Sequence, residues 1–303
     1  MSRIHEALKK AEQDRAAAQG PRIESFQTET IVAPPANGSE NPPHALHTVP
    51  PVSSQFTLET LLARCVPGNW LPDKKTMLFY DSDQAHGTEE FRTLRSRLYQ
   101  MREKHPLKKV LVTSSLPKEG KSFVAANLAQ VLVRQQGRRA LLIDGDLRAA
   151  RLHVTLGTAA APGLSDYLRG EADEFGIMQR GSMENLFFVA AGNSSSNPAE
   201  LVANGRLKLL LSRLETLFDW IIIDSPPAVP VSDAGVMANT CDGVLMVVRS
   251  NSTPADVARK ARAEFDDKRL LGVVLNGTNS RHASYGAYYG AYGTPDDKAG
   301  VQR

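Results

Sequence analysis

The feature that most constrains the fold of this chain is a regular alternation of apolar strands and helices between residues 86 and 278. Short aliphatic runs with almost no polar interruption are typical of strands that are buried on both faces of a parallel sheet. The helical stretches between them supply the crossover connections that parallel strands need. The sequence therefore predicts an α/β fold with a mostly parallel sheet flanked by helices. The predicted strands cover 109–113, 140–144, 186–189, 220–224, 243–248 and 271–275, and the predicted helices cover 121–136, 164–168, 207–217 and 255–265.

The segments on either side of this region have a different composition. Residues 1–18 contain a short amphipathic helix, predicted over 3–17, whose apolar stripe is too small to hold an isolated helix, so it either docks on a partner or frays. Residues 19–54 carry many prolines among polar residues, and we expect a disordered linker there. The folded domain is expected over 55–278, and residues 279–303 are expected to form a flexible tail rich in Gly and Tyr.

Composition argues against several classes of protein. The formal net charge of the 303 residues is +3, which is too small to predict a nucleic-acid partner. Cys65 and Cys241 are too far apart in sequence for a zinc site of usual spacing, and we expect two free thiols in a reducing compartment. No run approaches the roughly 18 apolar residues of a membrane span, and the first residues lack the apolar core of a secretory signal. We therefore expect a cytoplasmic protein.

A candidate phosphate-binding loop follows the first predicted strand. Residues 115–122 read Ser-Leu-Pro-Lys-Glu-Gly-Lys-Ser between a strand and a helix, which is the P-loop layout with Ser115 in place of the usual first glycine. The N–H groups of such a loop and of the following helix N-terminus bind phosphates. We expect Gly120 to allow their close approach, Lys121 to contact the β- and γ-phosphates, and Ser122 to bind Mg²⁺. The predicted nucleotide-binding residues of this loop are Ser115, Leu116, Pro117, Lys118, Glu119, Gly120, Lys121, Ser122 and Phe123.

Acidic residues end the next predicted strand, where residues 142–148 read Leu-Ile-Asp-Gly-Asp-Leu-Arg. Positions two apart in an extended segment point the same way, so Asp144 and Asp146 can face one site. Beside Mg²⁺ and phosphates, two carboxylates suit metal binding and the acceptance of a hydroxyl proton. Arg148 could neutralise phosphate charge or pair with one of these two carboxylates.

A third strand also ends in an acid. Residues 221–227 read Ile-Ile-Ile-Asp-Ser-Pro-Pro, and an apolar strand with Asp224 at its tip is the Walker B arrangement that holds Mg²⁺. Asp233 follows a few residues later, and we expect only a helix cap at Ser232 or Asp233.

Two further patterns lie outside these strand ends. A helical stretch carries Glu89, Arg92 and Arg95 at spacings of three, which alone predicts a ladder of intrahelical salt bridges. Four tyrosines in the tail have Gly, Ala, Ser and His as neighbours, so packing in a core does not explain them: Tyr285, Tyr288, Tyr289 and Tyr292.

Together, these motifs resemble those of the bacterial P-loop tyrosine kinases (BY-kinases), in particular the cytoplasmic CpsD/CapB-like exopolysaccharide tyrosine autokinases. In that family a Walker A loop, a second motif of the form apolar-apolar-Asp-x-Asp-x-Arg (the A-prime motif) and a Walker B motif occur in this order. Ordinary P-loop NTPases lack the A-prime motif. The resemblance covers about residues 86–292 and includes the family's Glu-x-x-Arg-x-x-Arg oligomerisation motif and tyrosine-rich C-terminus.

The resemblance implies a P-loop NTPase of the deviant Walker type that is an ATP-dependent protein-tyrosine autokinase with Mg²⁺ as cofactor. It implies that Lys121 and the loop amides bind ATP, and that Ser122, Asp144 and Asp224 hold Mg²⁺. Asp144 is the implied base for the tyrosine hydroxyl, Asp146 assists at the metal, and Asn276 contacts adenine. The implied phosphoacceptors are Tyr285, Tyr288, Tyr289 and Tyr292, and the implied oligomerisation residues are Glu89, Arg92 and Arg95.

The resemblance also implies partners. We expect a homo-oligomeric ring, and a membrane-embedded polysaccharide co-polymerase that activates the kinase and places it at the inner membrane. The implied process is the regulation of exopolysaccharide or capsule synthesis and export.

Two other functions stay open. A partition- or cell-division-type P-loop ATPase would share the fold, but such proteins carry a second lysine near the start of the loop, where this chain has Leu116. An ATP-binding regulatory scaffold without phosphotransfer would not need catalytic groups, and Lys121, Asp144 and Asp224 are all present.

Overall fold

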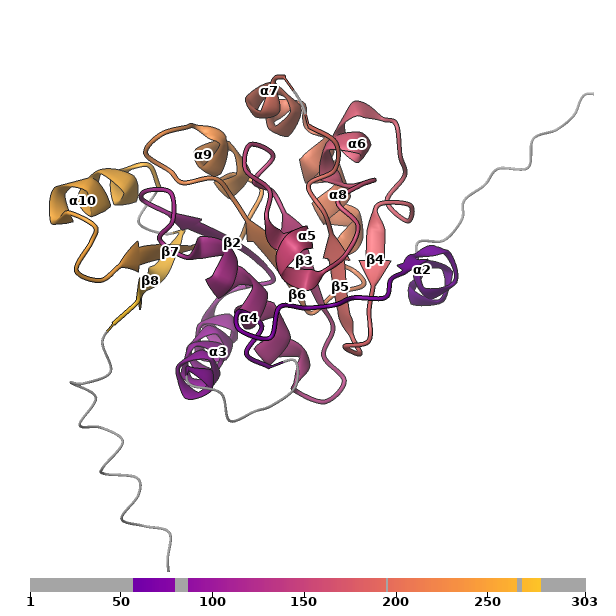
Figure 1. The fold of residues 1–303 in the computed structure, drawn as a ribbon, viewed down its shortest axis with the longest axis horizontal. Helices are drawn as coiled ribbons and strands as arrows, with labels where there is room; N and C mark the ends of the chain where they lie inside the picture. Colours follow the sequence, from indigo (N-terminus) through magenta and orange to yellow (C-terminus); the bar gives the residue numbers. More distant parts are fainter. Residues whose placement is uncertain (1–56, 80–86, 195, 266–268, 279–303) are drawn as a thin grey trace, which may run out of the picture. The chain divides into compact units, whose positions relative to one another are not determined.

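The computed structural model describes residues 57–79, 87–194, 196–265 and 269–278, and within them eight strands form one sheet (Figure 1). The strand order is β1-β4-β5-β3-β6-β2-β7-β8, and every neighbouring pair is parallel except β4 and β5. The predicted α/β fold with a mostly parallel sheet is confirmed. The strands are β1 Val66–Pro67, β2 Lys109–Ser114, β3 Ala140–Asp144, β4 Met178–Arg180, β5 Leu186–Val189, β6 Trp220–Asp224, β7 Gly243–Arg249 and β8 Leu270–Asn276.

The central strands are buried along their whole length because helices cover both faces of the sheet. All five residues of β3 and of β6 are buried, which agrees with their uninterrupted aliphatic sequences. One face packs against α3, α4 and α5, and the other against α6 to α10. The helices are α2 Leu58–Arg64, α3 Thr88–Lys104, α4 Lys121–Val133, α5 Leu152–Leu156, α6 Leu164–Arg169, α7 Pro198–Ala203, α8 Arg206–Leu214, α9 Asp233–Ala238 and α10 Ala255–Ala263.

All six strands that the sequence predicts are present, with boundaries that agree to within one residue. The predicted helix over 121–136 ends three residues early, at Val133, because the chain turns through Gly137, whose φ is +74°. The short elements β1, β4, α5 and α7 were not predicted. The predictions for 1–18, 19–54 and 279–303 lie outside the described residues.

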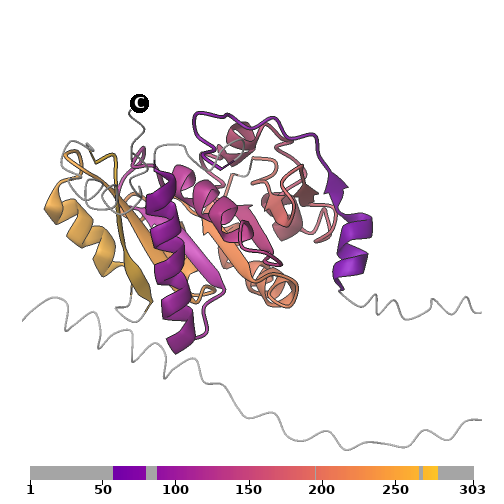
Figure 2. The ribbon, with the colours of Figure 1, turned by 90° about the horizontal axis from the view of Figure 1, so that it is seen from below.

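An N-terminal strap, residues 57–79, runs along the domain from α2 towards α4 and lies where the sequence predicts the folded domain to begin. Its strand β1 extends the sheet beside β4, and α2 lies at the end of the molecule opposite α10 (Figures 1 and 2). The indole of Trp70 packs edge-on against Phe188, with 6.3 Å between ring centroids. Further along, the Leu78 N–H donates to Asn127 Oδ1 of α4 at 2.8 Å. The strap therefore supports the helix that follows the predicted P-loop.

Across the described ranges, no helix combines the length and the apolar character needed to span a bilayer.

Candidate functional site

The loop between β2 and α4 has the conformation of a P-loop. Strand β2 ends at Ser114, and α4 begins at Lys121, so residues 115–120 form the connection. Gly120 has φ +96°, and a Cβ atom there would lie 2.1 Å from Nδ2 of Asn276, so this position needs glycine for both reasons. Lys118 also has a positive φ, +67°, which is unusual for a residue with a side chain. Nothing in the sequence indicated this backbone conformation at Lys118.

A buried glutamate holds the loop closed. The Oε2 atom of Glu119 accepts a hydrogen bond from the Leu116 N–H at 2.8 Å, and its Oε1 atom accepts one from the Thr253 hydroxyl. From β8, the side-chain amide of Asn276 donates to the Glu119 carbonyl at 2.8 Å. The loop is therefore attached to the β7–β8 end of the sheet, which fixes its backbone before any ligand arrives.

The predicted catalytic and metal-binding side chains meet at the carboxyl ends of three adjacent strands. Strand β6 lies between β3 and β2, and Asp144 is the register partner of Asp224. The Lys121 ammonium lies 2.9 Å from Asp146 Oδ2, and the Ser122 hydroxyl donates to Asp224 Oδ2 at 2.5 Å. This agrees with the rule that ligands of α/β sheets bind at the carboxyl ends of the strands.

Asp144 is fully buried and fixed by the backbone. Its Oδ1 atom accepts the Asp146 N–H at 3.2 Å, and its Oδ2 atom accepts the Leu152 N–H at 3.1 Å. Burial, together with the neighbouring charge of Asp224, raises the pKa of Asp144 to about 8. A carboxyl group with such a pKa suits proton transfer near neutral pH better than an ordinary aspartate does.

Lys121 is the counter-charge for this acidic site. Burial alone would lower the pKa of its ammonium, but the carboxylates of Asp224 and Asp146 outweigh burial and raise the pKa above its usual value. Burial also raises the pKa of Asp224 to about 6, although Lys121 opposes that shift. One lysine thus faces three buried carboxyl groups, which leaves the site short of positive charge.

The site fits a divalent cation only together with a phosphate ligand. The Oδ1 atom of Asp224 is buried and has no hydrogen-bond partner, so it is available to a cation. Within the ranges that the structure describes, no group of three or more His, Cys, Asp and Glu side chains is arranged to hold a metal. Mg²⁺ commonly takes one or two carboxylates and completes its shell with water and substrate phosphates. Ser122, Asp144 and Asp224 are compatible with that role.

Two sequence-based expectations about individual side chains are met only in part. Arg148 pairs with neither Asp144 nor Asp146, because its guanidinium makes two hydrogen bonds to Asp233, at 2.8 and 3.0 Å. Helix α9 does begin at Asp233 with Ser232 as its N-cap residue, but neither side chain caps it. No local pattern could have revealed the Arg148–Asp233 pair, because 85 residues separate the partners.

The remaining predicted residues lie as follows. Arg92 pairs with Glu89 as expected, whereas Arg95 donates to the Val131 carbonyl of α4 at 3.1 Å, so the ladder has one rung. The Asn276 amide touches the loop backbone, and its contact to adenine stays a prediction. Both cysteines are free and buried. The four tail tyrosines lie outside the described residues.

Comparisons with known proteins point to one class of enzyme. No protein-family model matches the chain. It is 35% identical over 220 residues to tyrosine-protein kinase YwqD of Bacillus subtilis (strain 168), covering 72% of this chain and 92% of that protein. It is 34% identical over 219 residues to tyrosine-protein kinase CpsD of Streptococcus agalactiae, covering 71% and 94%. The solved kinase domain of the Escherichia coli tyrosine kinase ETK is similar with a TM-score of 0.65 and 28% identity, covering 69% of this chain and 82% of that chain.

Proposed function

Because the chain belongs to the family of bacterial tyrosine-protein kinases, we propose that it transfers the γ-phosphoryl group of ATP to tyrosines of its own C-terminal segment. The observation that carries the proposal is the meeting of Lys121, Asp146, Ser122 and Asp224 beside a preformed P-loop. Phosphoryl transfer needs mainly positioning and charge stabilisation, and this set of groups supplies both.

The nucleotide is held by the loop and by Lys121. The amides of residues 115–122 and the N-terminus of α4 face the phosphates, and the Lys121 ammonium contacts the β- and γ-phosphoryl oxygens. Asp146 holds this ammonium at 2.9 Å, which orients it towards the loop. Ser122, Asp144 and Asp224 would hold Mg²⁺, which would supply positive charge at the transferring phosphoryl group.

Asp144 accepts the proton of the attacking tyrosine hydroxyl. Its two backbone hydrogen bonds fix the carboxylate plane, and its raised pKa makes it a stronger base than a solvated aspartate once it is ionised. The acceptors are the four tail tyrosines, Tyr285, Tyr288, Tyr289 and Tyr292.

The proposal includes a setting in the cell. We place the kinase in the cytoplasm as a homo-oligomeric ring, recruited to the inner membrane by a membrane-embedded co-polymerase of exopolysaccharide or capsule synthesis. The support is family membership, together with the exposed Glu89 and the Arg92 beside it on α3.

One experiment separates this function from the alternatives. The purified 303-residue chain is incubated with Mg²⁺ and ATP, alone and together with the cytoplasmic segment of its membrane co-polymerase. Phosphotyrosine and free phosphate are measured together, with Lys121→Met as the control. The kinase forms phosphotyrosine in the tail, whereas a partition-type ATPase releases phosphate without phosphotyrosine. A regulatory scaffold yields neither product, and either of these two results would reject the proposal.

A further inference from the structure

One ion pair near the site, between Arg148 and Asp233, has no part in the proposed chemistry. The carboxylate of Asp233 is 1% exposed and takes two hydrogen bonds from one guanidinium, while the Arg148 side chain is 39% exposed. A planar, two-point contact of this kind fixes direction as well as distance. It connects the A-prime motif after β3 to the first residue of α9.

Arg148 lies within the turn that carries Asp146. The Oδ1 atom of Asp146 accepts the Ala149 N–H at 2.9 Å, which closes the turn around Leu147 and Arg148. The other oxygen of the same carboxylate, Oδ2, holds the Lys121 ammonium. Because the same carboxylate makes both contacts, the conformation of the turn affects the position of the Lys121 ammonium.

The segment that leads to Asp233 is attached to the base of the P-loop. The segment that joins β6 to α9 lies against the end of β2, where the Thr113 hydroxyl donates to the Pro226 carbonyl at 2.9 Å. Two residues on, the Ala228 N–H donates to the Ser114 carbonyl at 2.8 Å. The Arg148–Asp233 pair therefore joins the A-prime turn to the framework that carries the phosphate-binding loop.

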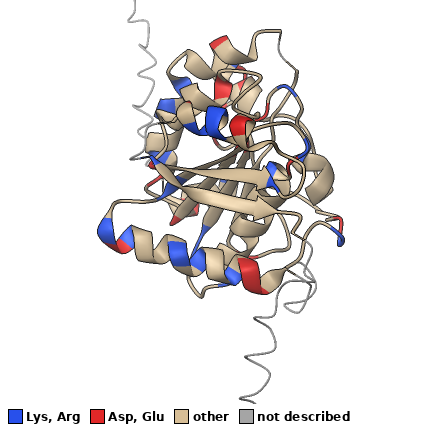
Figure 3. Cartoon of the chain, turned by 90° about the vertical axis from the view of Figure 1, so that its left-hand side faces the viewer, with Lys and Arg blue, Asp and Glu red and all other residues tan. Residues whose placement is uncertain are grey.

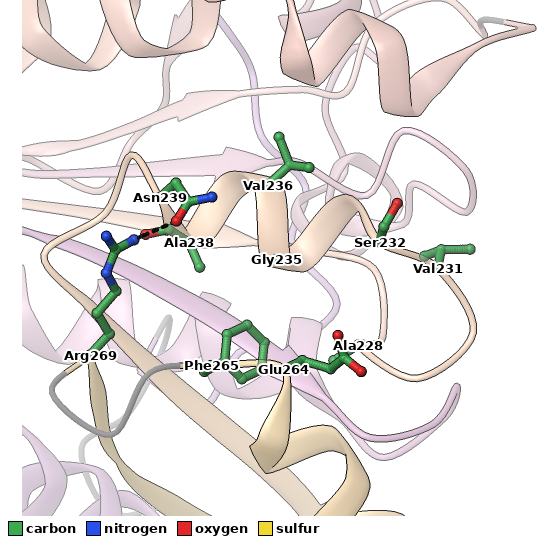
Figure 4. Close-up of a pocket in the computed structure, with 10 residues that line it drawn as sticks. All are labelled: Ala228, Val231, Ser232, Gly235, Val236, Ala238, Asn239, Glu264, Phe265 and Arg269. Atoms are coloured by element: carbon green, nitrogen blue, oxygen red, sulfur yellow. Dashed lines mark hydrogen bonds between the residues drawn. The ribbon is translucent and has the colours of Figure 1, made fainter. Parts of the chain in front are cut away.

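Polar contacts at both ends of α9 hold a helix that faces the core on one side and a cavity on the other. A cavity of about 350 Å³ opens along one side of this helix, lined by Ser232, Gly235 and Val236 among others (Figure 4). At the far end of α9, Arg269 donates to the Ala238 carbonyl at 3.0 Å (Figure 4). An arginine thus holds each end of a helix of only six residues.

We propose that Asp233 is a positioning residue, which acts through Arg148 to hold the Asp146 turn and the Lys121 ammonium in the geometry for phosphoryl transfer. Asp233 touches neither Asp146 nor Lys121 in the ion pairs of the site, so its effect on the reaction passes through the guanidinium. The inference rests on the proposed kinase function and assigns to it a residue outside the Walker A, A-prime and Walker B motifs.

The test is a double-mutant cycle with Asp233→Asn, Arg148→Gln and the combined variant. Each single variant lowers kcat for tail phosphorylation about tenfold to a hundredfold, as a misplaced catalytic group does, while the nucleotide Kd changes less than about threefold. The combined variant is no slower than the slower single variant, because both changes break the same link. Binding is measured with a fluorescent ADP analogue, and kcat is measured at saturating Mg²⁺ and ATP.

Glu174→Gln is the matched control. Glu174 is 8% exposed and pairs with Arg213, which is 41% exposed, at 2.7 Å, so this pair resembles Arg148–Asp233 in burial but lies away from the site. The control variant lowers the melting temperature by an amount similar to Asp233→Asn and leaves kcat unchanged. Equal losses of kcat in both variants would mean that Asp233 acts only on general stability, which overturns the inference.

Other results of the same experiments also test the proposed role of Asp233. Additive losses in the combined variant overturn the inference, because the two residues then act separately. A large rise in nucleotide Kd for Arg148→Gln alone assigns Arg148 to phosphate contact and overturns it too. If Asp233→Asn does not fold, the partly exposed Arg148→Gln tests the same prediction.

A wild type without phosphotyrosine removes the kinase function and this inference together, whereas an active wild type with an unaffected Asp233→Asn removes only the inference.

Discussion

At the scale of residues, the charged side chains of this site shift one another's pKa values. Lys121 is the single cation among three buried carboxyl groups, and the raised pKa values of Asp144 and Asp224 express the resulting excess of negative charge. Clusters of perturbed pKa values are typical of functional sites. A bound divalent cation would offset the excess negative charge of these carboxylates and of the phosphates of a nucleotide.

Replacement of Lys121 by methionine should abolish phosphotransfer and leave the fold intact. Methionine retains the length of the side chain but has no ammonium group. The charge-assisted contacts of the Lys121 ammonium to the phosphates are worth on the order of 3–4 kcal/mol at the transition state. Tail phosphotyrosine is measured by immunoblot and the fold by circular dichroism. A folded variant with undiminished phosphorylation would contradict the assigned role.

Asp144→Asn should slow the reaction far more than it weakens nucleotide binding, because asparagine retains the shape but cannot accept a proton. A single-turnover rate and a nucleotide Kd measured on the same preparation test this expectation. Equal losses in both quantities would instead assign Asp144 to ground-state binding of Mg²⁺.

The same variant should stabilise the ligand-free protein at high pH. The pKa of Asp144 is raised to about 8 in the fold, above its ordinary value of 3.8, so folding opposes ionisation and stability falls as pH rises between those values. Asparagine removes this penalty, so the gain in stability should be clear at pH 8 and small at pH 4. Melting curves without Mg²⁺ and nucleotide test the pH dependence. A gain that is independent of pH would reject the assigned cause.

Most side chains that the structure brings together at the candidate site could be predicted at the residue scale, because each lies within eight residues of a strand end that the aliphatic pattern marks. The pairs that orient them could not. Arg148 finds Asp233, and Asn276 reaches Glu119, only after strands that are distant in sequence have assembled in the sheet. Their partners depend on tertiary geometry, which local spacing does not encode.

At the scale of elements, α3 packs its apolar face on the sheet and carries exposed charges on the rest of its surface. Figure 3 shows Lys and Arg along this helix, with acidic residues towards both of its ends. Glu89 is 76% exposed, and an ion pair at such a position contributes about 0–1 kcal/mol to stability. The Glu89–Arg92 pair is therefore better suited to an intermolecular contact than to holding its own helix.

The triple variant Glu89→Ala, Arg92→Ala, Arg95→Ala should dissociate the oligomer while the melting temperature changes by only a few degrees. Complementary charges on one face can set the register of a head-to-tail ring, and their loss removes that register. Light scattering reports the assembly, and Glu103→Ala with Lys104→Ala, at the other end of α3, is the control. The same oligomer in the triple variant and the wild type would reject this interface.

The predictability of elements follows from their length and burial. Strands β2, β3 and β6 were predicted closely because they are buried aliphatic runs beside turn residues. Strand β4, of three residues, and β1, of two, are too short to show periodicity, and they exist because the strap and the sheet edge meet. Contacts between segments that are distant in sequence therefore determine β1 and β4, which the sequence pattern did not predict.

At the scale of the whole molecule, the tail begins beside the catalytic end of the sheet. Strand β8 ends at Asn276, whose side chain touches the P-loop, and Tyr285 follows nine residues later. Nine residues span at most about 30 Å when extended. We propose that, in a ring, each tail enters the active site of the neighbouring subunit. Each phosphate adds about −1.5 to −2 charges, so a phosphorylated tail would be repelled by the acidic site and released.

The central claim is that this site phosphorylates tail tyrosines, and a mixing experiment tests it most directly. Lys121→Met protein with an intact tail is combined with catalytically intact protein whose four tail tyrosines are phenylalanine, in the presence of Mg²⁺ and ATP. Phosphorylated residues are then mapped on each chain by mass spectrometry. The account predicts phosphate on Tyr285, Tyr288, Tyr289 or Tyr292 of the Lys121→Met chain. An unmodified tail on that chain, while wild-type protein becomes phosphorylated under the same conditions, would contradict transfer between subunits, and an unmodified tail in the wild type as well would contradict the kinase assignment itself.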